Sequence, residues 1–97
     1  MHSYKGLSLE GKRALVFGGT SGLGKAISIG FAEAGADVVA VGRRAEEVHR
    51  TAWEIKATGR RTVEMTGDVT DRTQIQAVID RMLDELDRID ILVNSAG

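Results

Sequence analysis

The 97 residues of this chain are enough for one domain, and 42% of them are hydrophobic and 28% charged, as in ordinary globular proteins. The 13 basic and 14 acidic residues give a net charge of −1 and the apolar runs are short, which argues against a nucleic-acid-binding surface and a membrane span. The sequence has no cysteine, which excludes disulfides and thiolate metal sites, and Met1–Gly6 has no apolar secretion signal, so we expect a cytoplasmic protein.

The first predicted unit is a strand, a turn and a helix. Residues 1–8 are polar and expected to be flexible, whereas residues 12–17 are apolar and bounded by glycines, which predicts a buried strand. After a glycine-rich turn, apolar residues at helical spacing predict a helix that begins near Leu23 and ends before a left-handed cap at Gly35. The predicted buried face of this helix comprises Leu23, Ala26, Ile27, Gly30, Phe31 and Ala34.

A second unit repeats this order. The β-branched run 37–41 predicts a strand, and a helix over residues 45–57 follows and is closed by Gly59. Trp53 lies off the apolar stripe of this helix, where it covers the helix edge or meets a partner. The predicted buried face comprises Val48, Ala52 and Ile55.

The last third of the chain adds a strand, a helix and a strand. Residues 61–66 alternate, with Val63 and Met65 facing inward. Thr70-Asp71 offers a helix N-cap with Gln74 in capping-box register, and Asp87 occupies the position of a left-handed C-terminal cap. The helix has a buried stripe of Ile75, Val78, Ile79, Met82 and Leu86, and residues 90–94 form the fourth strand.

Strands and helices therefore alternate with short connections, without a linker or repeat. This order predicts an α/β fold of the doubly wound type, with a parallel sheet that has helices on both faces. Right-handed crossovers favour the strand order 3-2-1-4. The fourth strand then lies at an edge and is apolar over residues 91–93, so we expect another strand beside it.

The turn between the first strand and the first helix is the principal candidate site. Gly18, Gly22 and Gly24 allow a tight bend, a close approach of a pyrophosphate to the backbone, and close packing of the helix on the sheet. The helix N-terminus directs free N–H groups at the turn, and Thr20 and Ser21 add hydroxyl donors. A glycine-rich turn that binds nothing is the alternative interpretation of this motif taken alone.

Four motifs in one order resemble those of the short-chain dehydrogenase/reductase family. They are Leu9-x-Gly11-Lys12, Gly18-x-x-x-Gly22-x-Gly24, Asp68-Val69, and the run Ile91-Leu92-Val93-Asn94-Ser95-Ala96-Gly97. The resemblance covers residues 7–97 and implies a Rossmann-type domain that binds a nicotinamide dinucleotide. The cofactor-binding residues that it implies, together with the turn, are Gly18, Gly19, Thr20, Ser21, Gly22, Leu23, Gly24, Arg43, Arg44, Asp68, Val69, Asn94, Ala96 and Gly97.

The end of the second strand bears on the choice of cofactor. An NAD site normally has an acid there to accept a hydrogen bond from the ribose 2′-hydroxyl, but this chain has Gly42, followed by Arg43 and Arg44. A guanidinium holds a 2′-phosphate through charge-assisted bonds, so we expect NADP rather than NAD. The alternative is two solvated arginines at a helix start, where positive charge opposes the helix dipole.

Two further residues have both a binding and a structural interpretation. By resemblance, Asp68 meets the adenine amino group beside the Val69 backbone, but an Asp before Thr70 is also a common turn or capping residue. Asn94 lies at the carboxyl end of a strand, where open α/β sheets bind ligands, although Asn also simply ends strands. His2 and His49 lie far apart and are expected to be exposed rather than metal ligands.

The catalytic residues of the family are not found in this sequence. They are a Tyr-x-x-x-Lys pair and an upstream Ser, whereas the only tyrosine here is Tyr4, with Ser8 four positions later. One hypothesis is the cofactor-binding part of a truncated oxidoreductase, whose parent is a homo-oligomer acting on a small carbonyl or alcohol. The other is a non-catalytic nucleotide-binding module or engineered half-fold. In either case we expect residues 1–97 alone to be inactive.

Overall fold

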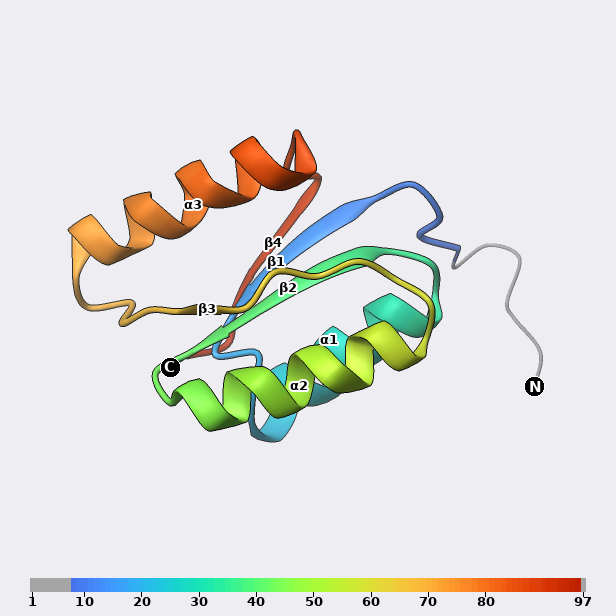
Figure 1. Ribbon diagram of the computed structural model, residues 1–97, viewed down its shortest axis with the longest axis horizontal. Helices are drawn as coiled ribbons and strands as arrows, with labels where there is room; N and C mark the ends of the chain where they lie inside the picture. Colours follow the sequence, from blue (N-terminus) through green and yellow to red (C-terminus); the bar gives the residue numbers. More distant parts are fainter. Residues whose placement is uncertain (1–7, 97) are drawn as a thin grey trace.

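The computed structural model describes residues 8–96 and has alternating strands and helices (Figure 1). Residues 1–7, including most of the segment expected to be flexible, and Gly97 lie outside the described residues. The elements are β1 Arg13–Phe17, α1 Gly22–Glu33, β2 Asp37–Gly42, α2 Ala45–Ala57, β3 Met65–Thr66, α3 Arg72–Leu86 and β4 Ile91–Asn94. The predicted order of elements is therefore confirmed.

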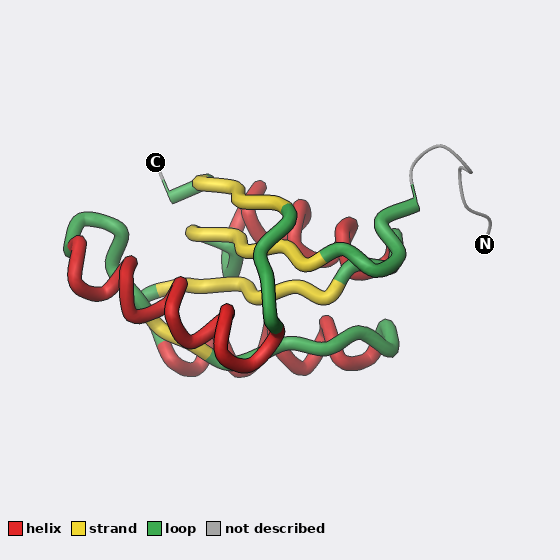
Figure 2. The backbone as a smooth tube through the Cα atoms, turned by 90° about the horizontal axis from the view of Figure 1, so that it is seen from above, coloured by secondary structure: helices red, strands yellow, loops and turns green. Residues whose placement is uncertain are grey.

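The four strands form one parallel sheet in the order β3-β2-β1-β4, as predicted (Figure 2). Leu15 pairs with Val39 of β2 on one side and with Leu92 of β4 on the other, so β1 is central. Helices α1 and α2 cover one face of the sheet and α3 covers the other (Figure 1). Parallel strands with both faces covered are apolar throughout, which explains why β1 and β2 have no alternation.

Each face of the sheet has its own hydrophobic core. The α3 face is the larger and contains Leu15, Phe17, Val39, Val41, Met65, Val78, Met82 and Leu86. The α1 and α2 face contains Ala14, Val16, Ala32, Ala36, Val38, Ala40 and Ile55. The predicted residues of α2 are all buried, and those of α3 belong to the first core or pack against it, so both stripes are confirmed. Trp53, predicted to lie off the α2 stripe, is 69% exposed.

The predicted buried face of α1 is only partly confirmed, since Phe31 packs against the core but several other predicted residues are exposed. The residues that α1 buries are Gly24, Ser28 and Ala32, whereas Leu23 is 72% exposed and Ala26 and Gly30 are also exposed. A side chain at position 24 would collide with the Gly18 carbonyl, so the turn brings the helix axis close to the sheet. The residues along that line of contact are small, and the larger Ile29 and Phe31 pack against the core while only partly buried.

Strand β3 is shorter than the predicted 61–66, and a side-chain interaction replaces regular pairing at Arg61. The backbone N–H of Arg61 donates to the Asp37 carboxylate at 2.9 Å instead of joining the sheet. The Arg61 carbonyl accepts from Val38 N–H at 3.1 Å, and regular pairing with β2 begins at Met65. Met65 is buried as predicted, whereas Val63 is only partly buried.

Helix α3 begins at its predicted cap. The Asp71 carboxylate accepts from the backbone N–H groups of Thr73 at 2.9 Å and Gln74 at 3.4 Å. The Gln74 side chain does not complete the capping box, because its oxygen accepts from Asp68 N–H at 2.9 Å. At the other end Asp87 has a φ of 75°, the only positive φ of a non-glycine residue within 8–96. The predicted left-handed cap at Asp87 is confirmed only in its positive φ, because its ψ of −37° lies outside the left-handed helical region.

Among the described residues, β4 forms one edge of the sheet and β3 forms the other. Strand β4 pairs with β1 alone, and Leu92 on it is 59% exposed.

No helix between residues 8 and 96 is both long and apolar enough to cross a membrane.

Candidate functional site

A cleft of about 690 Å³ opens at the carboxyl ends of the strands. This is the edge of a parallel sheet where open α/β folds bind ligands. Eleven of the fourteen residues predicted to bind the cofactor line it: Gly18, Thr20, Ser21, Gly22, Leu23, Gly24, Arg43, Arg44, Asp68, Val69 and Ala96. The fold thus brings separate segments of the sequence to one cavity.

The glycine turn has a geometry that side chains would block. Gly18 has a φ of 72°, and a Cβ there would lie 2.7 Å from the backbone nitrogen of Ala96. A Cβ at Gly24 would overlap the Gly18 carbonyl oxygen. Gly22 has a φ of 54° but faces open space, so its backbone is accessible to a ligand. These glycines leave a cradle of bare backbone, which a bulky anion can approach closely.

The N-terminus of α1 adds donors to this cradle. The N-cap residue Ser21 has extended backbone angles, and its side chain does not cap the helix. The first N–H groups of the helix have no partner within it, and their dipole favours an anion. Thr20 is buried yet lines the cleft. The turn therefore offers backbone and hydroxyl donors of the kind that a pyrophosphate requires.

Three predicted site residues stand apart from the cleft lining. Gly19 N–H donates to the Val41 carbonyl at 3.0 Å, as Gly18 N–H does at 2.9 Å, so these two donors shape the turn. The Asn94 side-chain oxygen accepts from Ala96 N–H at 3.1 Å, which is the strand-ending turn that was the structural alternative for this residue. Gly97 lies outside the described residues.

Arg43 and Arg44 have different surroundings. The Arg44 side chain is 76% exposed and pairs with Glu47 at 3.4 Å, one turn along α2. Arg43 is exposed and forms no ion pair within residues 8–96, and it lines the cleft. Glu46 and Glu47 in the first turn of α2 offset the unfavourable positions of the two arginines at the helix start.

Asp68 is held in a turn and still faces the cleft. Its Oδ1 accepts from the Thr70 hydroxyl at 2.7 Å and from Thr70 N–H at 2.9 Å. These two bonds hold the pKa of Asp68 below its ordinary value, and the positive charge of Arg43 lowers it further. The structural interpretation of Asp68 is confirmed, and its contact with adenine stays a prediction.

Several residues of the cleft were absent from the sequence-based prediction. They are Val41, Gly42, Glu47, Gly67, Thr70 and Ser95. Gly67 follows the last strand residue of β3, and its N–H donates to the Gly42 carbonyl at 3.0 Å. A rule that includes every residue directly after a parallel strand would have found Gly67 and Ser95. No sequence signal marks Glu47, which lines the cleft and pairs with Arg44.

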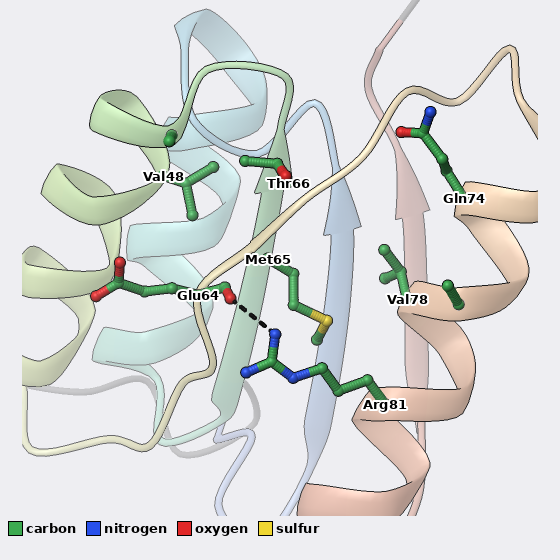
Figure 3. Close-up of a pocket in the computed structure, with 9 residues that line it drawn as sticks. Val48, Glu64, Met65, Thr66, Gln74, Val78 and Arg81 are labelled. Atoms are coloured by element: carbon green, nitrogen blue, oxygen red, sulfur yellow. Dashed lines mark hydrogen bonds between the residues drawn. The ribbon is translucent and has the colours of Figure 1, made fainter.

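A second hollow of about 390 Å³ lies between α2, β3 and α3 and differs in chemistry (Figure 3). Val48, Met65 and Val78 form its apolar wall, and the Arg81 guanidinium spans it to donate to the Glu64 carbonyl at 3.3 Å. His49 is exposed, as predicted, and pairs with Glu64 at 3.0 Å. Residues 8–96 contain no group of three His, Asp or Glu side chains able to hold a metal ion.

Comparison with known proteins extends the resemblance of the sequence motifs to a family match over residues 12–97. The model of the short chain dehydrogenase family matches residues 12–97. The 2-dehydro-3-deoxy-D-gluconate 5-dehydrogenase of Escherichia coli is 42% identical over 90 residues, which cover 93% of this chain and 35% of that protein. The chain spans about a third of the length of the curated relatives that it matches.

Two of the similar solved structures are complexes with NADP or its reduced form, NADPH. The L-sorbose reductase of Gluconobacter frateurii, complexed with NADPH and L-sorbose, has a TM-score of 0.89 and 36% identity over 94% of this chain and 35% of that one. The Pseudomonas aeruginosa RhlG/NADP complex has a TM-score of 0.85 and 35% identity over 94% of this chain and 36% of that one.

Proposed function

The chain belongs to the short-chain dehydrogenase family, and we propose that it forms the cofactor-binding region of an oxidoreductase that prefers NADP(H). The match over residues 12–97 carries the assignment to hydride-transfer chemistry. The reaction moves a hydride between the nicotinamide and a small carbonyl or alcohol, and the cofactor supplies or accepts that hydride. Cytoplasmic location and homo-oligomerisation stay predictions.

The residues of the cleft have distinct roles in this proposal. Gly18, Gly22 and Gly24 leave room for the pyrophosphate, and the first N–H groups of α1 donate to it. The Thr20 and Ser21 hydroxyls supply further donors. Asp68 accepts from the adenine amino group through the carboxylate oxygen that Thr70 leaves available. The bare backbone and the donor set fit a dinucleotide.

Arg43 carries the preference for NADP(H). It follows the strand end at which an acid would bind a ribose 2′-hydroxyl, and Gly42 stands at that position. Arg43 lines the cleft without an ion pair among the described residues, whereas Arg44 is already engaged by Glu47. We therefore assign the 2′-phosphate principally to Arg43, with Arg44 as a second, weaker contributor.

Catalysis requires groups that residues 1–97 do not supply. The family's Tyr-x-x-x-Lys pair has no counterpart, because Tyr4 is followed four residues later by Ser8. We expect residues 1–97 alone to show no oxidation of NADPH with a panel of carbonyl compounds above a control without protein. A saturable rate that depends on the protein would contradict the assignment of roles.

The test of the cofactor assignment is a calorimetric titration of NADPH and NADH against the purified protein at one ionic strength. Tighter binding of NADPH supports the proposal. Tighter binding of NADH would overturn the preference, and the absence of binding by either dinucleotide would overturn the cofactor site itself.

A further inference from the structure

Gly42, at the end of β2, is a glycine for a steric reason rather than a conformational one. Its φ lies outside the left-handed region, and it continues a regular parallel strand. A Cβ at position 42 would overlap the Thr20 hydroxyl oxygen and lie 3.1 Å from the Thr20 Cγ2. The backbone conformation at position 42 thus does not itself require glycine, and the three atoms nearest to an added Cβ all belong to Thr20.

The backbone on both sides of Thr20 is held in place. It is 8% exposed, and it lies between Gly19, whose N–H is bound to the Val41 carbonyl, and Ser21, the N-cap of α1. Gly19 is itself tightly enclosed, since a Cβ there would lie 2.8 Å from the Val16 carbonyl oxygen. The backbone that carries Thr20 therefore cannot retreat from position 42 unless the turn moves against β1 and β2.

We infer that Thr20 is a specificity-determining residue of this cleft, because its side chain occupies the space that an acidic side chain at position 42 would need. This inference rests on the proposed NADP(H) preference. An acid at position 42 would accept from a ribose 2′-hydroxyl and repel a 2′-phosphate. By excluding that acid, Thr20 leaves the strand end open to the phosphate and to Arg43. Thr20 and Gly42 thus act as a coupled pair.

A double-mutant cycle on dinucleotide affinity tests the coupling. The four proteins are the unmodified protein, Thr20→Ala, Gly42→Asp and the double variant that carries both substitutions. Thr20→Ala removes the two atoms that lie nearest to an added Cβ at position 42, and of the three nearest atoms it leaves the Cβ of residue 20, at 3.2 Å. We expect Gly42→Asp to strengthen NADH binding about tenfold more when it is combined with Thr20→Ala than when Thr20 is retained.

Thr20→Val is the matched control. Valine keeps two branches at Cβ and so still obstructs position 42, but it lacks the hydroxyl. Gly42→Asp combined with Thr20→Val should then change NADH binding by the same factor as Gly42→Asp does when Thr20 is retained. A gain with valine equal to that with alanine would show that the loss of the hydroxyl, rather than of bulk, permits the acid, and would overturn the steric inference.

Stability measurements make the test independent of dinucleotide binding. Gly42→Ala introduces only the obstructed Cβ, so it should lower the urea midpoint when Thr20 is retained and leave it nearly unchanged in the Thr20→Ala variant. Failure of the Gly42 variants to fold with Thr20, together with folding once Thr20→Ala is added, supports the coupling. Equal effects with and without Thr20→Ala would overturn the coupling, whereas tighter NADH binding by the unmodified protein would overturn only the cofactor preference.

Discussion

Arginine side chains lie at both ends of β2, but they are paired with a carboxylate at the amino end and Arg43 faces a cleft at the carboxyl end. At the amino end, the Asp37 carboxylate is enclosed by arginines, with Arg61 N–H at 2.9 Å, the Arg60 guanidinium at 3.1 Å and the Arg13 guanidinium at 3.8 Å. At the carboxyl end, Gly42 is followed by Arg43, which faces a cleft without an ion pair within residues 8–96. Positive charge is balanced within the chain at one end and available to a ligand at the other.

The ion pairs at the amino end of β2 therefore stabilise the fold, whereas Arg43 at the carboxyl end is available to bind a ligand. Asp37 is 4% exposed, and its bonds fix the connection between α2 and β3 to the start of β2. A buried carboxylate needs such partners, because an unpaired buried charge is costly. At the cleft the cost is avoided by exposure to solvent, and the guanidinium stays available. We therefore expect substitutions at the amino end to change stability and those at the carboxyl end to change binding.

The largest expected effect is at Asp37. Asp37→Asn keeps the shape of the side chain but removes the charge that Arg60 and Arg61 surround, so it should lower the free energy of unfolding by about 2–4 kcal/mol. Asp84→Asn, a change at an exposed carboxylate of α3, is the control and should have little effect. Urea unfolding followed by circular dichroism measures both. A loss below about 0.5 kcal/mol for Asp37→Asn would remove the proposed contrast between the two ends.

The same carboxylate predicts how stability depends on pH. Burial raises the pKa of Asp37, but the bond from Arg61 N–H and the Arg60 guanidinium outweigh it, and the pKa lies below its ordinary value. A lowered pKa contributes stability above about pH 4 and loses it as the pH falls through the folded-state value. The difference in urea midpoint between the unmodified protein and Asp37→Asn should therefore shrink on acidification from pH 7. A constant difference down to about pH 2 would contradict this.

A smaller effect in free energy is expected at the cleft. Arg43→Ala should weaken NADPH binding about ten- to a hundredfold, because a hydrogen bond to a charged group contributes roughly 1.5–3 kcal/mol. NADH binding should change far less, since it has no 2′-phosphate. Arg44→Ala should weaken NADPH binding less than Arg43→Ala does, and the double substitution should exceed either one. Equal losses for NADPH and NADH in Arg43→Ala would leave the arginines as surface charge.

The smallest effect is expected away from both ends, at the close of α3. Asp87 has a φ of 75°, which glycine adopts without the cost that a side chain brings. Asp87→Gly should therefore raise the free energy of unfolding by roughly 0.5–1 kcal/mol without a change in dinucleotide binding. An unchanged or lower urea midpoint would mean that the Asp87 side chain makes a compensating contact.

Most of the fold was predictable from the sequence because its local signals agree. The limits of α2 are those that the apolar pattern and Gly59 predicted, and Asp71 caps α3 as expected. The buried face of α1 was only partly predictable from hydrophobicity, because the turn brings the helix close to the sheet and the residues buried there, Gly24, Ser28 and Ala32, are small. Strand β3 was overestimated because periodicity does not show that Arg61 N–H binds a distant carboxylate.

The candidate site was predictable where it depends on the backbone and less so where it depends on side-chain partners. The glycine turn, the strand ends and Arg43 line the cleft as the motifs indicated. The pairing of Arg44 with Glu47 and the obstruction of position 42 by Thr20 are contacts that do not follow from spacing in the sequence. The first contact distinguishes Arg44 from Arg43. The second obstructs a side chain at position 42, at the carboxyl end of β2.

The central claim, that the carboxyl end of β2 accepts a 2′-phosphate, is tested most directly with two small ligands. Adenosine 2′,5′-bisphosphate and adenosine 5′-diphosphate share the adenosine and carry two phosphates each, but only the first has a phosphate on the 2′-oxygen. Calorimetric titration at fixed ionic strength should show about tenfold tighter binding of the 2′,5′-bisphosphate, and Arg43→Ala should abolish the difference. Equal affinities, or tighter binding of the 5′-diphosphate, by the unmodified protein would contradict the claim.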